Sequence, residues 1–291
     1  MLPTIVGLGE VLWDLFPDGP RFGGAPANFA CHAAMLGAEA AVVSRVGEDD
    51  LGERAAAALR QHGVETAFVG RDRHHATGAV RVQLDPEGRP QYEITEDVAW
   101  DHIAWTDDLE DLARRADAAC FGTLAQRSEA SRATIRRFLR GMRPGGLRIL
   151  DVNLRPPFVD GRVVLDSLGL ADAAKLSDEE LPEVAAMCGL SGTAPDLMRG
   201  LRERYGLRLV AVTRGAEGAM LFGDEGFVEC PGVTAVVKDT VGAGDAFTAA
   251  MVVGWLRGAD LESIGRHACR VAAFVCTQPG ATPELPGELK V

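Results

Sequence analysis

The segment of the sequence with the most chemical content is Asp239-Thr-Val-Gly-Ala-Gly-Asp245. In it Gly242 and Gly244 flank Ala243, and an apolar run from Phe247 to Leu256, typical of a buried helix, follows. Glycines where a strand passes into a helix let the backbone approach a ligand and turn consecutive N–H groups toward it, and the helix dipole adds to that field. The segment therefore predicts an anion-binding site at the start of a helix.

Asp245 falls in the first turn of that predicted helix. The dipole favours an ionised carboxylate there, which suits a base that accepts the proton of an incoming hydroxyl. Transfer of a phosphoryl group needs charge stabilisation and an aligned nucleophile, and three small residues followed by an acid supply both. In the simpler alternative, Gly-Ala-Gly only begins a helix and Asp245 caps it. No Gly-Lys-Ser/Thr follows, so this is not a Walker A loop.

Four segments along the chain, taken together, resemble the signatures of one family. They are Gly9-Glu-Val-Leu-Trp-Asp14, Gly23-Gly24-Ala-Pro-Ala-Asn28, Asp151-Val-Asn-Leu-Arg-Pro-Pro157 and Asp239 to Asp245. Their order is similar to that of the ribokinase-like (phosphofructokinase B type) carbohydrate kinases, and the third resembles the fructokinase branch. The resemblance implies a three-layer α/β/α sandwich with a mostly parallel central sheet and a small β-sheet lid.

The same resemblance implies an ATP-dependent sugar kinase, which transfers the γ-phosphate of ATP to a hydroxyl of a small carbohydrate. Asp245 would be the catalytic base, and the amides of Gly242, Ala243 and Gly244 would hold the developing charge. Fructose is the leading acceptor, with 2-keto-3-deoxygluconate, ribose or another sugar of the family as alternatives and nucleosides as a third option. A non-catalytic sugar or nucleotide sensor is the alternative from another class, although a sensor has no use for a base.

For the sugar, the resemblance implies contacts from Asp14, Gly24 and Asn28. Asp14 can accept from two hydroxyls, Asn28 can donate and accept at once, and Gly24 leaves room for the sugar ring. The simpler alternatives are a solvated loop aspartate, a plain glycine loop and an asparagine that caps a helix. Arg155 could bind the carboxylate of a sugar acid, because arginine forms bidentate contacts with such groups.

The expected cofactors are ATP, Mg²⁺ and, as in several members of the family, K⁺. Thr213, Gly215 and Gly218 lie in a segment that resembles the nucleotide loop, although a plain hairpin turn would have the same glycines. Glu180 matches the glutamate of a motif that helps to place Mg²⁺. Asp239, with the Gly280-Ala281 turn, matches a monovalent-cation site or is a turn residue at the end of a strand.

Two positions depart from the family pattern. Ser177 stands where the Mg²⁺ motif has asparagine, and Cys269 aligns with an asparagine near the adenine in many relatives. Ser-x-x-Glu from Ser177 to Glu180 also matches a helix capping box, and both interpretations of that segment can hold together.

The overall composition narrows the choice of partners. The 291 residues carry a net charge of −12, which disfavours nucleic acid. The six cysteines include no C-x-x-C pair, and no signal peptide or membrane span is indicated, so we expect a cytoplasmic protein with no membrane partner. His74 and His75 are adjacent in a polar segment, and adjacent histidines rarely bind one ion without further ligands, so no metal site is expected there.

The periodicity of the sequence predicts one α/β domain over residues 1–291, with strands and helices in alternation. Strands are expected at 4–8, 40–46, 116–121, 148–152, 173–176 and 208–213, with an antiparallel edge pair at 219–222 and 226–229. Helices are expected at 27–36, 49–62, 128–142, 179–188, 195–205, 243–257 and 260–277. A further strand is expected to end at Val237, and residues 17–26 are expected to form a loop.

The expected lid consists of two insertions, at about residues 10–24 and 77–104. In the second, alternating residues from Thr77 to Leu84, a turn at 85–88 and a further alternation at Tyr92 and Ile94 predict a β-hairpin. A lone hairpin with one apolar face is unstable, so that face must cover the core, a bound ligand or a second subunit in a homodimer. Closure of this lid over the sugar would exclude water and limit ATP hydrolysis.

Overall fold

The computed structural model describes residues 2–84 and 90–290. Its main sheet has nine strands in the order β13-β12-β11-β10-β9-β8-β1-β4-β5. From β11 across to β5 the neighbouring strands are parallel, whereas β12 and β13 form an antiparallel edge. The strands are β1 (Thr4–Leu8), β4 (Glu39–Gly47), β5 (Val69–Asp72), β8 (Ala118–Phe121), β9 (Leu147–Asp151), β10 (Ala173–Ser177), β11 (Leu209–Thr213), β12 (Ala219–Gly223) and β13 (Gly226–Cys230).

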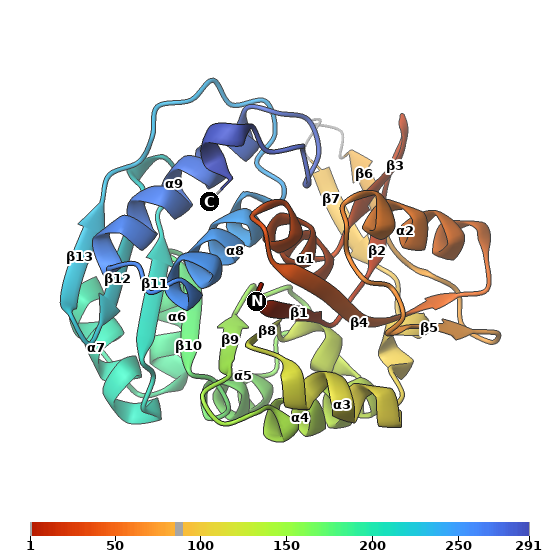
Figure 1. Ribbon diagram of the computed structural model, residues 1–291, viewed down its shortest axis with the longest axis horizontal. Helices are drawn as coiled ribbons and strands as arrows, with labels where there is room; N and C mark the ends of the chain where they lie inside the picture. The colour runs from red at the N-terminus through yellow and green to blue at the C-terminus, as the bar shows by residue number, and fades with distance from the viewer. Residues whose placement is uncertain (1, 85–89, 291) are drawn as a thin grey trace.

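Helices cover both faces of this sheet and give three layers (Figure 1). Alternate residues of a strand point to opposite faces, so Ile5 belongs to one apolar core and Val6 to the other. The first core packs against α1 (Ala25–Met35), α2 (Asp50–Gln61), α8 (Ala243–Leu256) and α9 (Leu261–Cys276). The second packs against α3 (Asp107–Arg115), α4 (Glu129–Gly141), α5 (Gly161–Leu168), α6 (Glu180–Met187) and α7 (Ala194–Tyr205).

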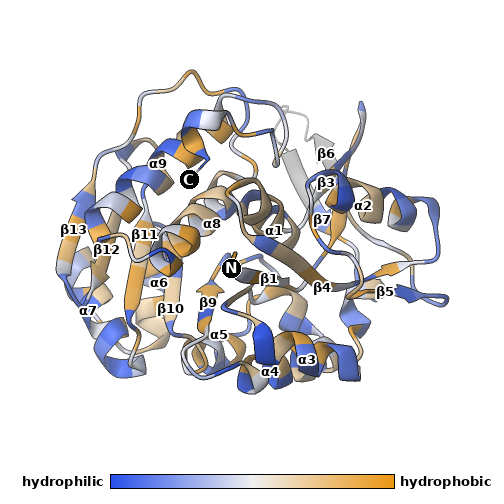
Figure 2. Ribbon diagram, viewed as in Figure 1, coloured by the Kyte–Doolittle hydropathy of each residue, from blue (hydrophilic) through white to orange (hydrophobic). Residues whose placement is uncertain are grey.

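In Figure 2 the strands from β10 to β12 are mostly apolar, whereas α3 and α4 carry many polar residues. None of the helices in residues 2–84 and 90–290 is long and apolar enough to cross a membrane.

A second, smaller sheet has the order β3-β2-β6-β7. It is built from β2 (Leu12–Phe16) and β3 (Gly19–Gly23) together with β6 (Gly78–Leu84) and β7 (Pro90–Ile94), and the parallel pairing of β2 with β6 joins the two insertions. Trp13 fastens this sheet to the main body, because its indole N–H donates to the carbonyl of Leu51 at 2.9 Å. The expected small sheet is thereby confirmed, whereas residues 99–102 of the second insertion form a 3₁₀ helix, η1 (Ala99–His102).

Several local predictions differ from the structure. The expected loop at 17–26 is wrong, because residues 19–23 pair with β2 as an edge strand, where Pro20 is tolerated. The strand expected to end at Val237 is also wrong, since residues 231–241 lie in no strand and Val236 and Val237 are 83% and 60% exposed. Sequence periodicity gave no indication of α3, α5 or β5. The turn expected at 85–88 lies outside the described residues.

Asp49 connects the start of α2 to Thr77, the residue that precedes β6 of the small sheet. Its Oδ1 accepts from the amide of Gly52 and from Thr77 Oγ1, and its Oδ2 accepts from the amide of Thr77. By contrast, Asp260 is an exposed cap of α9 whose carboxylate accepts from the amide and the hydroxyl of Ser263, a residue of the same helix. Both are helix caps, but only Asp49 spans two elements.

We therefore expect Asp49→Ala to lower the free energy of unfolding by about 2–3 kcal/mol, and Asp260→Ala by about 1 kcal/mol. The difference arises because Asp49→Ala also leaves the Thr77 amide without its partner. Urea denaturation of both variants measures this, and equal losses would show that Asp49 is only a cap.

Candidate active site

The predicted site residues gather at one edge of the main sheet. The carboxyl ends of β1, β9 and β10 open there, and α1 and α8 begin there, so carboxylates at strand ends meet two helix N-termini. A small cavity at this edge is lined by Glu10, Asp151 and Asn153 together with apolar side chains that include Phe29 and Leu124.

Asn28 and Asp245 are 217 residues apart in the sequence and are in direct contact. The side-chain amide of Asn28, in α1, donates to Asp245 Oδ2 at 2.8 Å. The other polar atom of that amide, Oδ1, is buried and has no hydrogen-bond partner among the described residues. The structure thus joins the expected sugar motif to the expected base and leaves one acceptor for a ligand hydroxyl.

At two positions of the site the backbone conformation and the close packing of a neighbouring carbonyl group require glycine. Gly24, before α1, has a φ of 108°, and Gly242, before α8, has a φ of 79°. A Cβ on Gly24 would lie 2.5 Å from the carbonyl oxygen of Glu10, and one on Gly242 would lie 2.3 Å from that of Ala281. Both positions therefore require glycine even without a ligand.

A buried polar network supports the first turn of α8. Lys175 Nζ lies 3.1 Å from Asp151 Oδ1, and Thr248 Oγ1 lies 2.9 Å from both Asp151 Oδ2 and the carbonyl oxygen of Gly244. Lys175 also leaves little space at Gly244, where a Cβ would lie 3.0 Å from Nζ. These three polar residues were not among the predicted site residues, although a lysine inside an apolar strand was a signal that could have found them.

Burial raises the pKa of Asp245 to about 6, and the nearby Asp151 carboxylate adds to the effect. The hydrogen bond from Asn28 and the charges of Lys175 and Arg155 act in the opposite direction. Asp245 is therefore mostly ionised at pH 7 and still basic enough to accept a proton. A base of this strength is what the chemistry expected of Asp245 requires.

Burial also raises the pKa of two further acids, Glu10 to about 7 and Asp14 to about 6. Arg155 opposes the shift at Glu10, Asp14 and Asp245 alike, so its guanidinium acts on all three. Arg155, after β9, thus lies close enough to Asp14 on the small sheet and to Asp245 at the start of α8 to lower the pKa of both.

Ser177 and Glu180 form the reciprocal contacts of a capping box. Glu180 Oε2 accepts from the Ser177 amide at 2.8 Å, and the Glu180 amide donates to Ser177 Oγ at 3.1 Å. Glu180 Oε1 accepts from the amide of Leu154 at 2.7 Å, which ties the segment after β9 to the start of α6. Both oxygens of Glu180 are thus engaged, and each keeps a lone pair for a water molecule.

The glycine loop after β11 is a tight turn. Gly215 and Gly218 have φ values of 52° and 94°, and the amide of Gly218 donates to Gly215 while its carbonyl accepts from Arg214. A Cβ on Gly218 would lie 2.1 Å from the carbonyl oxygen of Cys230. Gly218 is therefore needed for the turn, whereas Thr213 ends β11 at the same edge of the sheet as the site.

Asp239 connects the segment before α8 to the turn at residues 280–281. Its Oδ1 accepts from the amide of Val241 at 3.0 Å, and its Oδ2 accepts from that of Gly280 at 3.1 Å. The structure thus brings together the two segments that the sequence pairs as a cation site. Cys269, in α9, is 6% exposed and belongs to the apolar core.

Comparison with known proteins agrees with this geometry. A family model described as pfkB family carbohydrate kinase matches residues 19–287. The chain belongs to the pfkB family of carbohydrate kinases. The predicted family and the α/β sandwich with a smaller second sheet are confirmed, and the protein is a carbohydrate kinase.

Individual relatives match over nearly their whole length. A fructokinase of Klebsiella pneumoniae is 34% identical, over 96% of this chain and 95% of its own. The structure of an uncharacterized sugar kinase from Pyrococcus horikoshii in complex with ATP is 29% identical, with a TM-score of 0.81 and coverage of 97% and 94%. That of a Vibrio cholerae fructokinase with bound fructose, ADP and calcium ion is 27% identical, with a TM-score of 0.81 and coverage of 98% and 96%.

The raised pKa of Glu10 leads to a stability prediction. Between its ordinary pKa and about 7 the folded protein binds the Glu10 proton more tightly than the unfolded chain, so the free energy of unfolding falls as the pH rises through this window. Over the whole window, this shift in the pKa of Glu10 corresponds to a loss of about 3 kcal/mol in the free energy of unfolding. We expect Glu10→Gln to remove that part of the pH dependence.

Urea denaturation of the wild type and Glu10→Gln at pH 5 and pH 8 provides the measurement. The loss in free energy of unfolding between the two pH values should be smaller in the variant by about 2–2.5 kcal/mol, because pH 5 already lies above the ordinary pKa of a glutamate. The comparison of differences cancels any constant effect of the substitution. The same loss in both proteins would mean that Glu10 is ionised at no cost.

Proposed function

We propose that this kinase transfers the γ-phosphate of ATP to fructose, with Asp245 as the catalytic base. The observation that carries the proposal is the 2.8 Å hydrogen bond from Asn28 to Asp245, which joins the amide expected to bind the sugar to the expected base in the first turn of α8. Fructose is favoured because relatives with 27–34% identity are fructokinases, one of them with bound fructose and ADP. The Asp151–Pro157 segment points to the same branch.

In the proposed reaction, a hydroxyl of the sugar loses its proton to the Asp245 carboxylate as its oxygen attacks the γ-phosphorus. The bond from that phosphorus to the bridging oxygen of ADP breaks, and the products are the sugar phosphate, ADP and protonated Asp245. The amides of Gly242, Ala243 and Gly244 stabilise the charge on the transferring group, and the dipole of α8 assists. Asp14, Gly24, Asn28 and Arg155 hold the sugar beneath the small sheet.

The nucleotide would lie along the loop that contains Thr213 and Gly215, with Gly218 shaping the turn. Mg²⁺, when bound with ATP, neutralises phosphate charge. The chain's donors fit an ion held through water, because both oxygens of Glu180 already accept from backbone amides and Mg²⁺ readily keeps its waters. Both oxygens of Asp239 likewise accept from backbone amides, so Asp239 shapes the loop before α8, and each oxygen keeps a lone pair for K⁺ or for a water bound to it.

The first test of the proposal is a substrate panel with Asp245→Asn. Wild-type protein with Mg·ATP should release ADP in the presence of fructose faster than with ribose, 2-keto-3-deoxygluconate, glucose or adenosine. Loss of the base should reduce kcat by at least about 100-fold in Asp245→Asn, whereas Asp260→Asn, an exposed cap, should be unaffected.

A coupled assay for ADP provides the measurement, with thermal unfolding as the check that both variants fold. Faster turnover of another sugar would overturn fructose and leave the kinase mechanism intact. Nucleotide binding without turnover of any sugar would support the sensor.

The raised pKa of Asp245 also predicts the acid limb of the rate profile. The base must be ionised to accept a proton, so kcat/KM for the best sugar should fall as the pH drops below about 6. Asn28 favours the ionised form through its hydrogen bond, so Asn28→Ala should move that limb to higher pH. A limb that stays in place in Asn28→Ala would mean that another acid, such as Asp14, controls it.

A further inference from the structure

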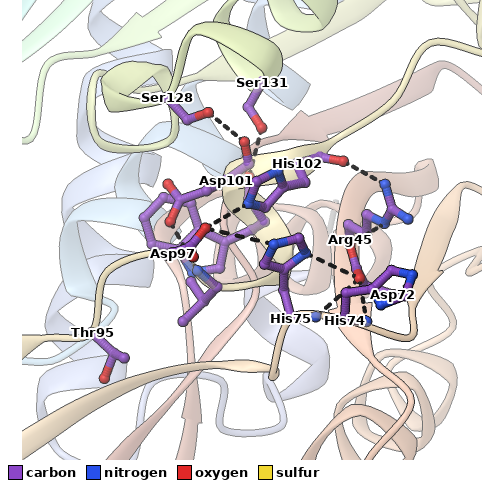
Figure 3. A network of polar contacts seen from close by, with 12 residues as sticks. Arg45, Asp72, His74, His75, Thr95, Asp97, Asp101, His102, Ser128 and Ser131 are labelled. Atoms are coloured by element: carbon purple, nitrogen blue, oxygen red, sulfur yellow. Dashed lines mark hydrogen bonds and ion pairs between the residues drawn. The ribbon is translucent and has the colours of Figure 1, made fainter.

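Two histidines and an aspartate, none of them among the residues of the site described above, converge beside the small sheet (Figure 3). His75 lies three residues before β6, Asp97 lies three residues after β7, and His102 is the last residue of η1. His75 and Asp97 thus belong to the two legs that connect the β6–β7 hairpin to the main body. In the sequence, His75 has only His74 beside it as a possible second ligand. The fold adds Asp97 and His102 as further ligands for an ion at His75.

The ligand atoms of the three residues are within reach of one ion. His102 Nε2 lies 2.8 Å and His75 Nε2 lies 3.6 Å from the same atom, Asp97 Oδ1, and all the ligand atoms are within 4.8 Å of one another. Ligand atoms around a tetrahedral zinc ion lie roughly 3.3 Å apart, given bonds of about 2.0–2.1 Å. The two observed distances to Asp97 fall on either side of that value.

A buried carboxylate lies behind His75. Asp72 Oδ1 is 3.1 Å from His75 Nδ1, and Asp72 is held in place by the amides of His74 and His75 and by Arg45 Nε at 2.9 Å. Histidines that bind metals commonly direct their second ring nitrogen to such a carboxylate, which selects the tautomer with a bare Nε2. The contact is short, although its alignment is poor for a hydrogen bond.

The rings of His75 and His102 are stacked, with centroids 3.7 Å apart and planes 17° from parallel. Imidazole binds metal ions in its neutral form, so the charge of such a site comes from its carboxylate. Asp97 is the one carboxylate of the three residues, and two imidazoles with one carboxylate are donors that a divalent transition-metal ion accepts.

We propose that His75 Nε2, His102 Nε2 and Asp97 Oδ1 bind one divalent transition-metal ion of the zinc type, with water completing its coordination. Asp97 is 78% exposed on its side chain, so water has access to the remaining positions. Two imidazoles with one carboxylate suit Zn²⁺ or Co²⁺ and disfavour Mg²⁺, which prefers oxygen ligands.

Binding requires one local rearrangement. A metal ion lies in the plane of each ring that binds it, so at least one of the two nearly parallel rings must rotate about its Cβ–Cγ bond. That torsion is soft in histidine, and the side chains of His75 and His102 are 25% and 33% exposed, which leaves room for the rotation. The backbone at His102 stays fixed meanwhile, because its carbonyl accepts from Arg45 Nη1 at 2.8 Å.

The ion would fasten the base of the small sheet. It would link both legs of the β6–β7 hairpin to η1, and Arg45 already connects η1 and Asp72 to β4 of the main sheet. The free energy of metal binding would then add to the stability of that junction, since the unfolded chain does not hold the three ligands together.

The test is a metal titration of the full chain after treatment with chelator and removal of the chelator. Zn²⁺ binding is measured by calorimetry, and Co²⁺ binding is measured by the visible absorption that tetrahedral nitrogen and oxygen ligation produces. We expect one equivalent of Zn²⁺ and a Co²⁺ spectrum in the wild type. His75→Ala, His102→Ala and Asp97→Asn should each weaken binding by at least about 100-fold, and Asp72→Asn by about 10–100-fold.

His74→Ala is the matched control, because His74 is an exposed neighbour outside the three ligands, and its affinity should equal that of the wild type. Asp97→Asn keeps a residue that tolerates the φ of 52° at this position, so it tests the site even if a histidine variant fails to fold. No stoichiometric binding by the wild type would overturn the proposal. Equal affinity in Asp97→Asn and the wild type would also overturn it and assign the ion to other groups.

Discussion

The ion pair between Lys175 and Asp151 is the constraint on which the site depends. β9 and β10 are parallel, and their register places the two residues opposite each other on one face of the sheet. A shift of one residue would point Lys175 to the other face and leave Asp151 as an unpaired buried charge, which costs about 3–5 kcal/mol. The charges beside the first turn of α8 are therefore correct only when β9 and β10 pair in this register.

This pair also sets the chemistry that Asp245 can perform. Asp151 raises the pKa of Asp245 and Lys175 lowers it, so the two members of the pair act in opposite directions on a carboxyl that burial has already shifted. Lys175 itself stays charged although burial disfavours its charge, because Asp151, Glu180 and Asp245 surround it and raise its pKa. In a chain of net charge −12, one buried ammonium thus balances several acids beside the place proposed for an anionic nucleotide.

The elements that the sequence predicted best are those with a strong period and clear end signals. Strands β1, β10 and β11 and helices α8 and α9 agree with expectation within a few residues, because long apolar runs end at glycine or at capping residues. β3 was missed because its glycines and proline suggest a loop, and only its pairing with β2 makes it a strand. Val236 and Val237 suggested a strand, but no neighbouring strand pairs with them in the described residues.

The site divides in the same way. Motifs that are continuous in sequence, such as Gly242 to Asp245, could be predicted, and the hydrogen bond between Asn28 and Asp245 agrees with their pairing. The sequence could not predict the roles of Lys175, Thr248 and the Glu10 carboxylate. These roles depend on the charges and hydrogen-bond partners around each group, which are set by the register and packing of distant segments. The reason for Gly242 is likewise tertiary, since it is the carbonyl of Ala281 that excludes a side chain.

The position of the small sheet is itself part of the electrostatics of the site. Asp14 lies on β2, and burial is the largest cause of its raised pKa, with Arg155 as the main opposing charge. Any displacement of the sheet that exposed Asp14 to water would remove the cause of the shift and lower its pKa toward the ordinary value. The contacts that hold the sheet, from Trp13 to Leu51 and from Asp49 to Thr77, therefore act on the protonation of Asp14 as well as on its place. A closure of this sheet over a sugar would therefore also change the pKa of Asp14, a residue proposed to bind that sugar.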